Sequence, residues 1–205
     1  MVTILPSSSL KNSQKDTFYL APLRKEDVAE RYVSWLNDPE INRYLEIRHA
    51  VPITQEDVIA FVEKCLFDRR PHWGIFDGKK HIGNVSCSAY DLRSRWIDIS
   101  FLLGEKDYWG KGICTDAIAS VLDYLFNEQL FHKVCGGTYS INKGSIRIFE
   151  KLGFAQEACF REQALLDGGY VDVFKFGLLK KDWFSNKNDW ARLKVYPLSW
   201  SFFLK

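Results

Sequence analysis

A glycine-containing turn in this sequence has the composition of an anion-binding site. Residues 107–115 read Asp-Tyr-Trp-Gly-Lys-Gly-Ile-Cys-Thr, between an apolar strand pattern over 96–103 and a helical apolar stripe from Ala117 to Phe126. Gly110 and Gly112 would let backbone N–H groups converge at the N-terminus of that helix, where they can bind a pyrophosphate. By themselves, two glycines are more typical of a plain connecting turn.

A second motif follows a predicted strand over 133–140. It reads Asn-Lys-Gly-Ser-Ile-Arg-Ile-Phe-Glu-Lys-Leu-Gly-Phe over residues 142–154. This pattern predicts a short helix that begins near Asn142 and ends at Gly153. Taken singly, Asn142 is most simply a helix cap and Gly153 a left-handed helix stop.

Together, the order strand, Gly-Lys-Gly turn, helix, strand, Asn-x-x-Ser, helix and Leu-Gly-Phe resembles the GNAT superfamily of acetyl-CoA-dependent N-acetyltransferases, in particular its RimJ/RimL-like branch. The resemblance runs from Phe18 to Trp183 and includes the segments 35–40 and 167–172. It implies an α/β fold with a mixed, mostly antiparallel sheet flanked by helices, whose central parallel strands splay apart at the acetyl-CoA site. It also implies transfer of an acetyl group to a primary amine by direct attack on the thioester.

The resemblance assigns the acetyl-CoA site to two backbone segments. Pantetheine would pair with the backbone near Leu103 and Gly104, and pyrophosphate would lie on the amides of the glycine turn. Trp109 and Cys114 depart from the family's usual Arg/Gln and Gly/Ala, but neither change removes an amide donor. The expected acetyl-CoA residues are therefore Leu103, Gly104, Trp109, Gly110, Lys111, Gly112, Ile113, Cys114, Thr115 and Asn142.

Attack on a thioester requires a neutral amine, whereas an alkyl ammonium has a pKa of about 10.4. A base must therefore accept a proton, and Asp98 is the first candidate because the family often places a glutamate at this column. Strand alternation would turn Asp98 away from the apolar face made by Ile97 and Ile99. A solvent-facing acid without a role is an equal alternative. Glu162 is a weaker second carboxylate, two residues before Ala164, which occupies the column of a glutamate in related ribosomal enzymes.

The leaving group raises a second question. Many family members protonate the departing thiolate with a tyrosine at the column occupied here by Phe149. Ser145 matches a serine that could serve instead, although it could equally cap the helix or bind pantetheine, and Tyr139 and Tyr170 are further possibilities. A thiol with a cysteine-like pKa near 8.5 leaves tolerably well as the thiolate. Phe149 also leaves open a non-catalytic acyl-CoA-binding module.

The acceptor is less well defined. The polar segment 43–49 contains Glu46 and Arg48, which together with Glu162 are candidate substrate-binding residues; the segment could equally be a charged surface loop. The segment 37–45 is similar to branch members that act on amino sugars and to others that act on protein N-termini. Its mixed charge slightly favours a polar small molecule, such as a nucleotide-linked amino sugar, over a protein N-terminus of the ribosomal-protein type.

These residues must be positioned by elements that the apolar patterns predict. The dipeptide Asp77-Gly78 predicts a hairpin, Thr54 and Asp57 predict a capped helix start, and the helix between the strands at 95–103 and 133–140 predicts that these two run parallel. The expected strands are 17–23, 72–76, 80–90, 95–103, 133–140, 156–166 and 170–179, and the expected helices are 24–36, 54–66, the one after the glycine turn, and 142–152.

Composition limits the remaining possibilities. A chain of 205 residues with 46% hydrophobic residues can bury one core, and a net charge of +2 with interspersed signs argues against nucleic acid. Five dispersed cysteines without a CxxC pair predict reduced thiols and no metal, and no apolar run is long enough for a membrane span. We expect a cytoplasmic enzyme with a flexible leader over 1–16, an acetyltransferase domain over 17–183, and an aromatic extension over 184–205 that packs on the domain or forms a homodimer.

Overall fold

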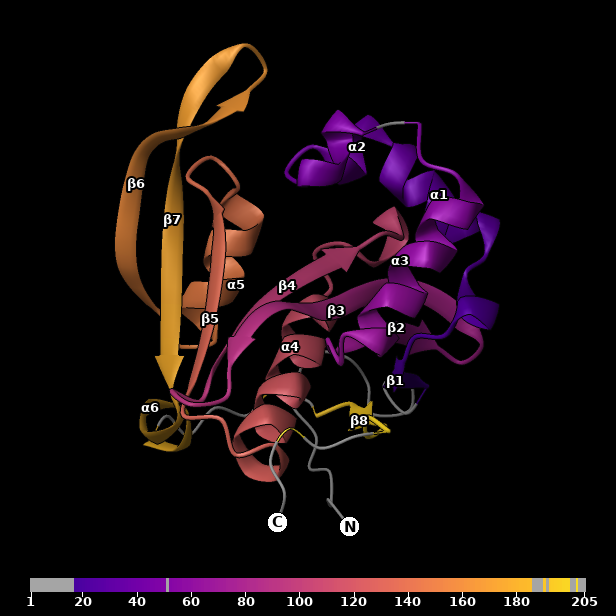
Figure 1. Cartoon of the computed structure of the whole chain (residues 1–205). Coiled ribbons are helices and arrows are strands. Elements are labelled where there is room, and N and C mark those ends of the chain that lie inside the picture. The colour runs from indigo at the N-terminus through magenta and orange to yellow at the C-terminus, as the bar shows by residue number, and fades with distance from the viewer. Residues whose placement is uncertain (1–16, 51, 186–189, 191, 200–201, 203–205) are drawn as a thin grey trace.

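An eight-stranded sheet organises the computed structural model of this chain, which describes residues 17–50, 52–185, 190, 192–199 and 202 (Figure 1). The predicted leader, 1–16, lies outside the described residues. The strand order is β6-β7-β5-β4-β3-β2-β1-β8, and all pairs are antiparallel except β4–β5 and β1–β8. The predicted mixed, mostly antiparallel sheet is confirmed. The strands are β1 (Phe18–Pro22), β2 (His72–Asp77), β3 (Lys80–Asp91), β4 (Trp96–Leu103), β5 (Lys133–Tyr139), β6 (Ala155–Leu166), β7 (Gly169–Leu179) and β8 (Lys194–Val195).

The helices cover both faces of this sheet. They are α1 (Glu30–Asn37), α2 (Pro39–Asn42), α3 (Gln55–Phe67), α4 (Ile113–Asp123), α5 (Lys143–Lys151) and α6 (Lys180–Ser185). The short 3₁₀-helices are η2 (Lys25–Asp27), η3 (Glu46–His49) and η4 (Lys106–Tyr108), and the π-helix η5 (Tyr124–Glu128) continues α4. The predicted capping box at the start of α3 is present, since the Thr54 hydroxyl accepts a bond from the Asp57 amide and the Asp57 carboxylate accepts one from the Thr54 amide.

The single helix predicted over 24–36 is wrong in its first part. Ala29 is extended, with φ −93° and ψ 163°, so η2 and α1 are separate. After α1 the chain breaks again at Asp38, because a residue before proline disfavours the helical conformation. Asp38 then caps α2 by accepting a hydrogen bond from the Glu40 amide at 2.8 Å. After these two breaks the polar segment 43–49 reaches Tyr139 at the end of β5 and the β6–β7 hairpin.

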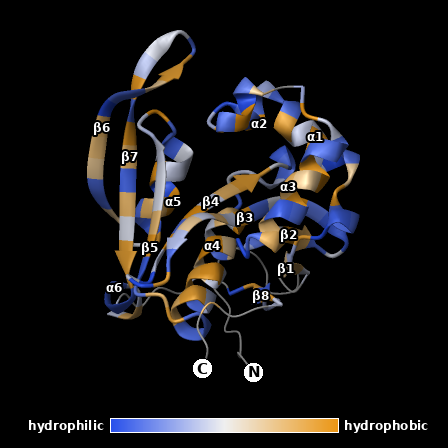
Figure 2. Cartoon of the chain, in the orientation of Figure 1, coloured by the Kyte–Doolittle hydropathy of each residue, from blue (hydrophilic) through white to orange (hydrophobic). Residues whose placement is uncertain are grey.

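Two apolar layers fix the sheet between the helices. On one face, Ile97 and Ile99 of β4 are buried with the apolar side of α4. On the other face, Tyr32 and Trp35 of α1 and Val58 of α3 form a second cluster. Figure 2 shows the apolar residues of β4 and α4 in orange at the centre of the molecule. The predicted alternation of Ile97, Asp98 and Ile99 is therefore observed, with Asp98 turned away from α4.

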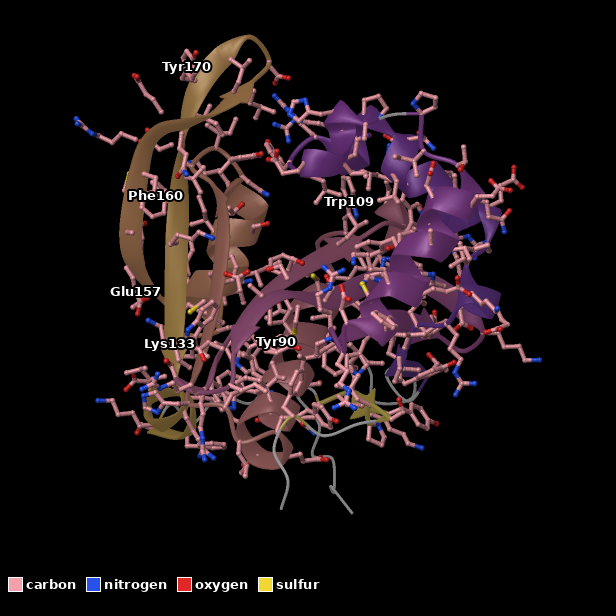
Figure 3. All side chains as sticks on the ribbon, viewed as in Figure 1. Tyr90, Trp109, Lys133, Glu157, Phe160 and Tyr170 are labelled. Carbon is pink, nitrogen blue, oxygen red and sulfur yellow. The ribbon has the colours of Figure 1, made fainter. Side chains whose placement is uncertain are left out.

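The central parallel strands pair only along part of their length. The pairs run from Trp96 with Lys133 to Ile99 with Gly136, and beyond them β4 continues against β3 alone. Figure 1 shows β4 and β5 diverging into a V with α5 beside β5. The predicted splay is thus present. At the closed end, Lys133 of β5 binds Glu157 of β6 at 2.6 Å (Figure 3).

An aromatic cluster holds α5 against the diverging strands. Phe149 of α5 is only 1% exposed and lies 5.6 Å from the ring of Phe101 and 4.8 Å from that of Phe176. Gly136 makes room for it, since a Cβ there would lie 2.6 Å from the Phe149 ring. The residue at the family's usual tyrosine column is therefore part of the core.

The described part of the C-terminal extension packs on its own domain. β8 pairs with β1, and Leu193 and Leu198 are each 7% exposed. Their amides donate hydrogen bonds to the Ser120 and Tyr124 hydroxyls of the α4–η5 helix, at 2.8 and 3.2 Å. Trp200 and Phe203 lie outside the described residues. Of the two arrangements expected for the extension, these contacts match the first, and the homodimer stays a prediction.

We predict that removing both buried leucines of the extension destabilises the whole domain. Truncation of a buried leucine to alanine costs about 2–5 kcal/mol, so the Leu193→Ala/Leu198→Ala variant should melt well below the parent protein. The matched control is Leu165→Ala, because that leucine is 53% exposed. Thermal unfolding followed by circular dichroism measures the difference. Equal melting temperatures for the double variant and the control would show that the extension adds nothing to stability.

A buried histidine links stability to pH. His72 of β2 lies below α1 and α3, where its Nε2 is 3.4 Å from the Tyr32 hydroxyl and its ring packs edge-on against Phe61. Burial, followed by the nearby His81 and Arg70, lowers the pKa of His72 from 6.5 to about 3. Between pH 6.5 and 3 the imidazole of His72 is therefore protonated in the unfolded chain and neutral in the folded chain. This difference makes the fold less stable as pH falls through that range.

We predict that His72→Gln flattens the acid side of the stability profile. One such group changes the free energy of unfolding by up to about 1.4 kcal/mol per pH unit. Chemical denaturation at several pH values between 3.5 and 7 measures the slope. His132→Gln is the control because His132 is exposed, and it should leave the slope unchanged. An identical slope for the parent and His72→Gln would contradict the assignment.

Candidate active site

A cavity of about 800 Å³ occupies the V between β4 and β5. It is lined by residues 98–103 of β4, the end of β5, the start of α5, the glycine turn, the α2–η3 segment and two residues of β7. Trp109 lies on the side of the V that carries α1 and α2 (Figure 3). Eight of the residues predicted from sequence line this cavity: Glu46, Asp98, Leu103, Trp109, Gly110, Cys114, Asn142 and Ser145.

The backbone that faces the gap differs in detail from the expectation. The Gly104 amide donates to the Ile82 carbonyl of β3 at 3.0 Å, and a Cβ on Gly104 would lie 2.0 Å from Trp35. Because hydrogen-bonding directions alternate along an antiparallel strand, the backbones of Phe101 and Leu103 face the V. The Leu103 carbonyl already accepts a bond from the Trp109 indole at 2.7 Å. Phe101, which also lines the cavity, was missed in the sequence.

The glycine turn is left-handed at both of its glycines. Gly110 and Gly112 have φ values of 72° and 80°, and nothing lies within 4 Å of a Cβ built on either residue. Glycine is therefore required by conformation rather than by space. Gly112 caps α4, and the first amide that bonds within the helix is that of Asp116, to the Gly112 carbonyl. The amides of Ile113, Cys114 and Thr115 precede it, and they carry the positive end of the helix dipole.

Lys111 extends from this turn towards the ring of Tyr108, with its ammonium 5.8 Å from the ring centre. Lys111, Gly112, Ile113 and Thr115 do not line the cavity itself. Burial raises the pKa of the Cys114 thiol to about 12. Cys114 is therefore a neutral, space-filling side chain at the start of α4, and the turn offers backbone amides rather than a thiolate.

Asn142 and Ser145 cap α5 and also face the cavity. The Asn142 side-chain oxygen accepts a bond from the Ser145 amide at 3.2 Å, while its side-chain nitrogen donates to the Ser145 hydroxyl at 3.0 Å. The capping role expected of Asn142 is thus observed. Since the Ser145 oxygen accepts from Asn142, its own proton is free to be donated elsewhere.

Asp98 stands on the cavity side of β4, opposite the buried isoleucines. Its side chain is 19% exposed, and one carboxylate oxygen accepts a hydrogen bond from the Ser88 hydroxyl at 2.8 Å. Ser88 lies at a register shift of β3, between Cys87 and Ala89, where the strand bulges. The other carboxylate oxygen lies 3.9 Å from the ammonium of Lys175 on β7. The carboxylate is held in place but still accessible from the cavity.

Tyr139, at the end of β5, joins the two walls of the cavity. Its hydroxyl donates a hydrogen bond to the Glu46 carboxylate and accepts one from Arg48 at 3.1 Å. The Arg48 guanidinium also lies over the tyrosine ring, 5.3 Å from its centre. Burial raises the pKa of Tyr139, the bond to Glu46 raises it further, and Arg48 opposes both. Tyr139 is therefore a protonated donor at neutral pH.

Two further contacts tie the α2–η3 segment to the β6–β7 hairpin. Arg43 pairs with Asp167 in the hairpin turn at 2.7 Å, and Arg48 donates to the Leu165 carbonyl at 3.1 Å. An exposed ion pair of this kind adds little stability. Its effect is geometric, because together with the Tyr139 contacts it joins the α2–η3 segment to β5 and to the β6–β7 hairpin across the cavity. We call this group, Arg43, Glu46, Arg48, Tyr139 and Asp167, the bridge.

Glu162 is placed away from this site. The β6–β7 register shifts between Phe160 and Ala164, and Glu162 has a positive φ of 51°. The irregular strand interrupts the alternation on which its predicted position depended, and its amide instead donates to Asp172 at 2.8 Å. Glu162 is exposed and does not line the cavity. Ser88 and Lys175 replace it as neighbours of Asp98, and only the sheet register could have revealed them.

The comparisons with known proteins identify the class. Residues 17–155 match the family model of the acetyltransferase (GNAT) domain, which covers more than half of the chain. The chain therefore belongs to the GNAT family of N-acetyltransferases, as its motifs indicated, and the acyl donor of that family is acetyl-CoA.

Individual relatives and one solved structure are similar to this chain in the same family. The chain is 28% identical over 175 residues to "Probable N-acetyltransferase YjcK" of Bacillus subtilis (strain 168), covering 81% of this chain and 96% of that protein. It is 26% identical over 115 residues to the [ribosomal protein uS5]-alanine N-acetyltransferase of Escherichia coli (strain K12), covering 55% of this chain and 59% of that protein. The crystal structure of spermidine N-acetyltransferase from Vibrio cholerae, in complex with CoA and spermine, shares the fold with a TM-score of 0.74 at 22% identity, over 84% of this chain and 99% of that one.

Within the residues that the structure describes, no group of three or more His, Cys, Asp and Glu side chains could hold a metal ion. No helix in the described ranges is both long and apolar enough to cross a membrane.

We predict that Gly112→Val weakens CoA binding. Valine is strained at a φ of 80° and its branched side chain would obstruct approach to the turn amides, so the dissociation constant should rise by roughly tenfold or more. Isothermal titration with CoA measures it. Gly78→Val is the matched control, because Gly78 also has a positive φ and open space but lies in the β2–β3 hairpin. Unchanged affinity in a folded Gly112→Val protein would place the pyrophosphate elsewhere.

Proposed function

We propose that this chain transfers the acetyl group of acetyl-CoA to a primary amine of a polar small molecule, with an amino sugar as one candidate. The observation that carries the proposal is a single cavity that reaches from the glycine turn to Asp98. One end offers backbone amides suited to a pyrophosphate, and the other offers a held carboxylate suited to an ammonium. Acetyl-CoA, when bound, supplies the thioester carbonyl that the amine attacks.

In this proposal Asp98 accepts a proton from the acceptor ammonium, directly or through one water. The hydrogen bond from Ser88 keeps one carboxylate oxygen in place, and the other oxygen is left to face the amine. Proximity to the carboxylate also favours binding of the ammonium before it loses its proton. The amine that results is uncharged and can attack directly, with no covalent intermediate on the protein.

The departing thiolate needs little help in this arrangement. Phe149 is in the core and has no hydroxyl, so it can take no part in proton transfer. Ser145 is the nearest match by motif, because its hydroxyl lines the cavity and its proton is free to be donated. A thiol of pKa about 8.5 is in any case a moderate leaving group at neutral pH.

The bridge supports a small acceptor over a protein N-terminus. Contacts from Arg43 to Asp167 and from Tyr139 to Glu46 join opposite walls of the cavity, which leaves less room for an extended peptide than for a small molecule. The E. coli relative named for ribosomal protein uS5 keeps the N-terminal acceptor as the second candidate. Free CoA release measured with amino sugars, amino acids, diamines and a peptide with a free N-terminus separates the two. Turnover with the peptide alone would overturn the small-molecule assignment, and CoA binding without any turnover would indicate a non-catalytic module.

We predict that Asp98→Asn lowers kcat/KM by roughly 10²–10⁴-fold at neutral pH, which is the usual loss on removal of a general base. The deficit should shrink as pH rises, because more of the amine is then already uncharged. CoA affinity should stay within about twofold of the parent value, since the carboxylate is remote from the glycine turn. Steady-state kinetics from pH 6.5 to 9.5 measure the effect. Asp182→Asn, at an exposed aspartate of α6, is the control, and near-normal turnover of Asp98→Asn at pH 7 would exclude it as the base.

A further inference from the structure

We propose that Lys175 is a specificity-determining residue that binds an anionic group, a carboxylate or a phosphate, carried by the acceptor amine. This inference rests on the proposed function of the same cavity and narrows its substrate class. It begins from a basic side chain that lines the cavity beside the candidate base and that the sequence motifs did not single out.

The position of Lys175 depends on a glycine of the neighbouring strand. Lys175 of β7 is paired in register with Gly137 of β5. A Cβ at Gly137 would lie 3.0 Å from Cδ of Lys175 and 3.1 Å from its Nζ. The aliphatic stem therefore lies flat across β5, and the ammonium reaches towards β4, 3.9 Å from the Asp98 carboxylate. Because β5 lacks a side chain at this point, a residue two strands away borders the acceptor end of the cavity.

The ammonium is available to a ligand, unlike the two arginines of the bridge. Arg43 is paired with Asp167, and Arg48 donates to the Tyr139 hydroxyl. Lys175, by contrast, is 45% exposed, and its distance to Asp98 exceeds hydrogen-bonding range. Among the described residues, Asp98 is the sole carboxylate within 4.0 Å of it. At this distance the lysine keeps its three donors for a ligand.

Asp98 and Lys175 together present opposite charges side by side. An acceptor whose amine approaches Asp98 brings its neighbouring substituent close to Lys175. A carboxylate or phosphate there would form charge-assisted hydrogen bonds, whereas a second ammonium would meet a like charge in a partly desolvated site. The pair therefore favours amino acids or phosphorylated amino sugars over diamines and polyamines.

The donor is a less suitable partner for this lysine. The amides that fit pyrophosphate lie at the start of α4, at the open end of the V. Lys175 instead borders Gly137, the first residue of β5 beyond the paired segment that ends at Gly136. The lysine is thus beside the apex of the V, where Asp98 also stands. CoA affinity consequently serves as an internal check on the assignment.

The test compares matched acceptors in the parent protein and in variants of Lys175. The acceptors are glucosamine 6-phosphate against glucosamine, an amino acid against its amide, and 1,4-diaminobutane. For a pair of acceptors that the parent protein acetylates, kcat/KM for the anionic member should fall by about ten- to a hundredfold in Lys175→Gln. That for the neutral member should fall by less than about threefold. Lys175→Arg should retain the preference, and Lys175→Glu should shift it towards the diamine. Lys181→Gln, at an exposed lysine of α6, is the control.

Three results would overturn the proposal. The first is an equal ratio of kcat/KM for the anionic and the neutral acceptor in the parent protein and in Lys175→Gln. If amines are still acetylated, this result leaves the proposed function intact. The second is a weaker CoA complex in Lys175→Gln, which would assign the lysine to the donor. The third is the absence of turnover with every amine in the parent protein, which would overturn the proposed function itself.

Discussion

The site depends on one constraint, the loss of pairing between β4 and β5 after Ile99 and Gly136. A strand needs partners for the backbone groups on both of its sides. Beyond the last pair, β4 keeps β3 and β5 keeps β7, so each strand turns one row of amides and carbonyls towards the V. A ligand with amide groups of its own can satisfy those rows as a strand would, which is what pantetheine provides.

The glycines at 136 and 137 adapt the diverging strand to both of its faces. Gly136 admits the ring of Phe149 on the α5 side, and Gly137 admits the stem of Lys175 on the other. The absence of a side chain at Gly136 therefore allows packing of the core, and its absence at Gly137 allows Lys175 to reach the cavity. A side chain at 136 would force α5 away from Phe101 and Phe176, while one at 137 would displace the lysine from Asp98 without entering the core. Adjacent residues of identical type are in this way under different physical constraints.

Local chemistry in the sequence was enough to predict most of the elements and one half of the site. The glycine turn, the α3 capping box and the Asn142 cap involve residues within a few positions of each other, so their patterns are readable along the chain. The neighbours of Asp98 are different, because Ser88 and Lys175 reach it through a bulge and through a register set by three strands. Glu162 was misplaced for the same reason, since an irregular stretch of β6 carries no local signal. The direction of the Gly104 amide, towards β3, could not be predicted from the sequence either, because it depends on the pairing of the two strands.

The C-terminal extension has a consequence for how the chain reaches this structure. Its described residues contact the far end of the helix that begins at the glycine turn: Leu193 binds Ser120, Leu198 binds Tyr124 and Phe202 binds Gln129. Synthesis on the ribosome proceeds from the N-terminus, so these partners emerge some seventy residues after the helix that they cover. Until then the Ser120 and Tyr124 hydroxyls and the Gln129 side chain lack these amide donors. The helix that begins at the glycine turn therefore gains these three contacts only after the segment 193–202 has been synthesised, so its C-terminal end is completed later than its contacts with β4.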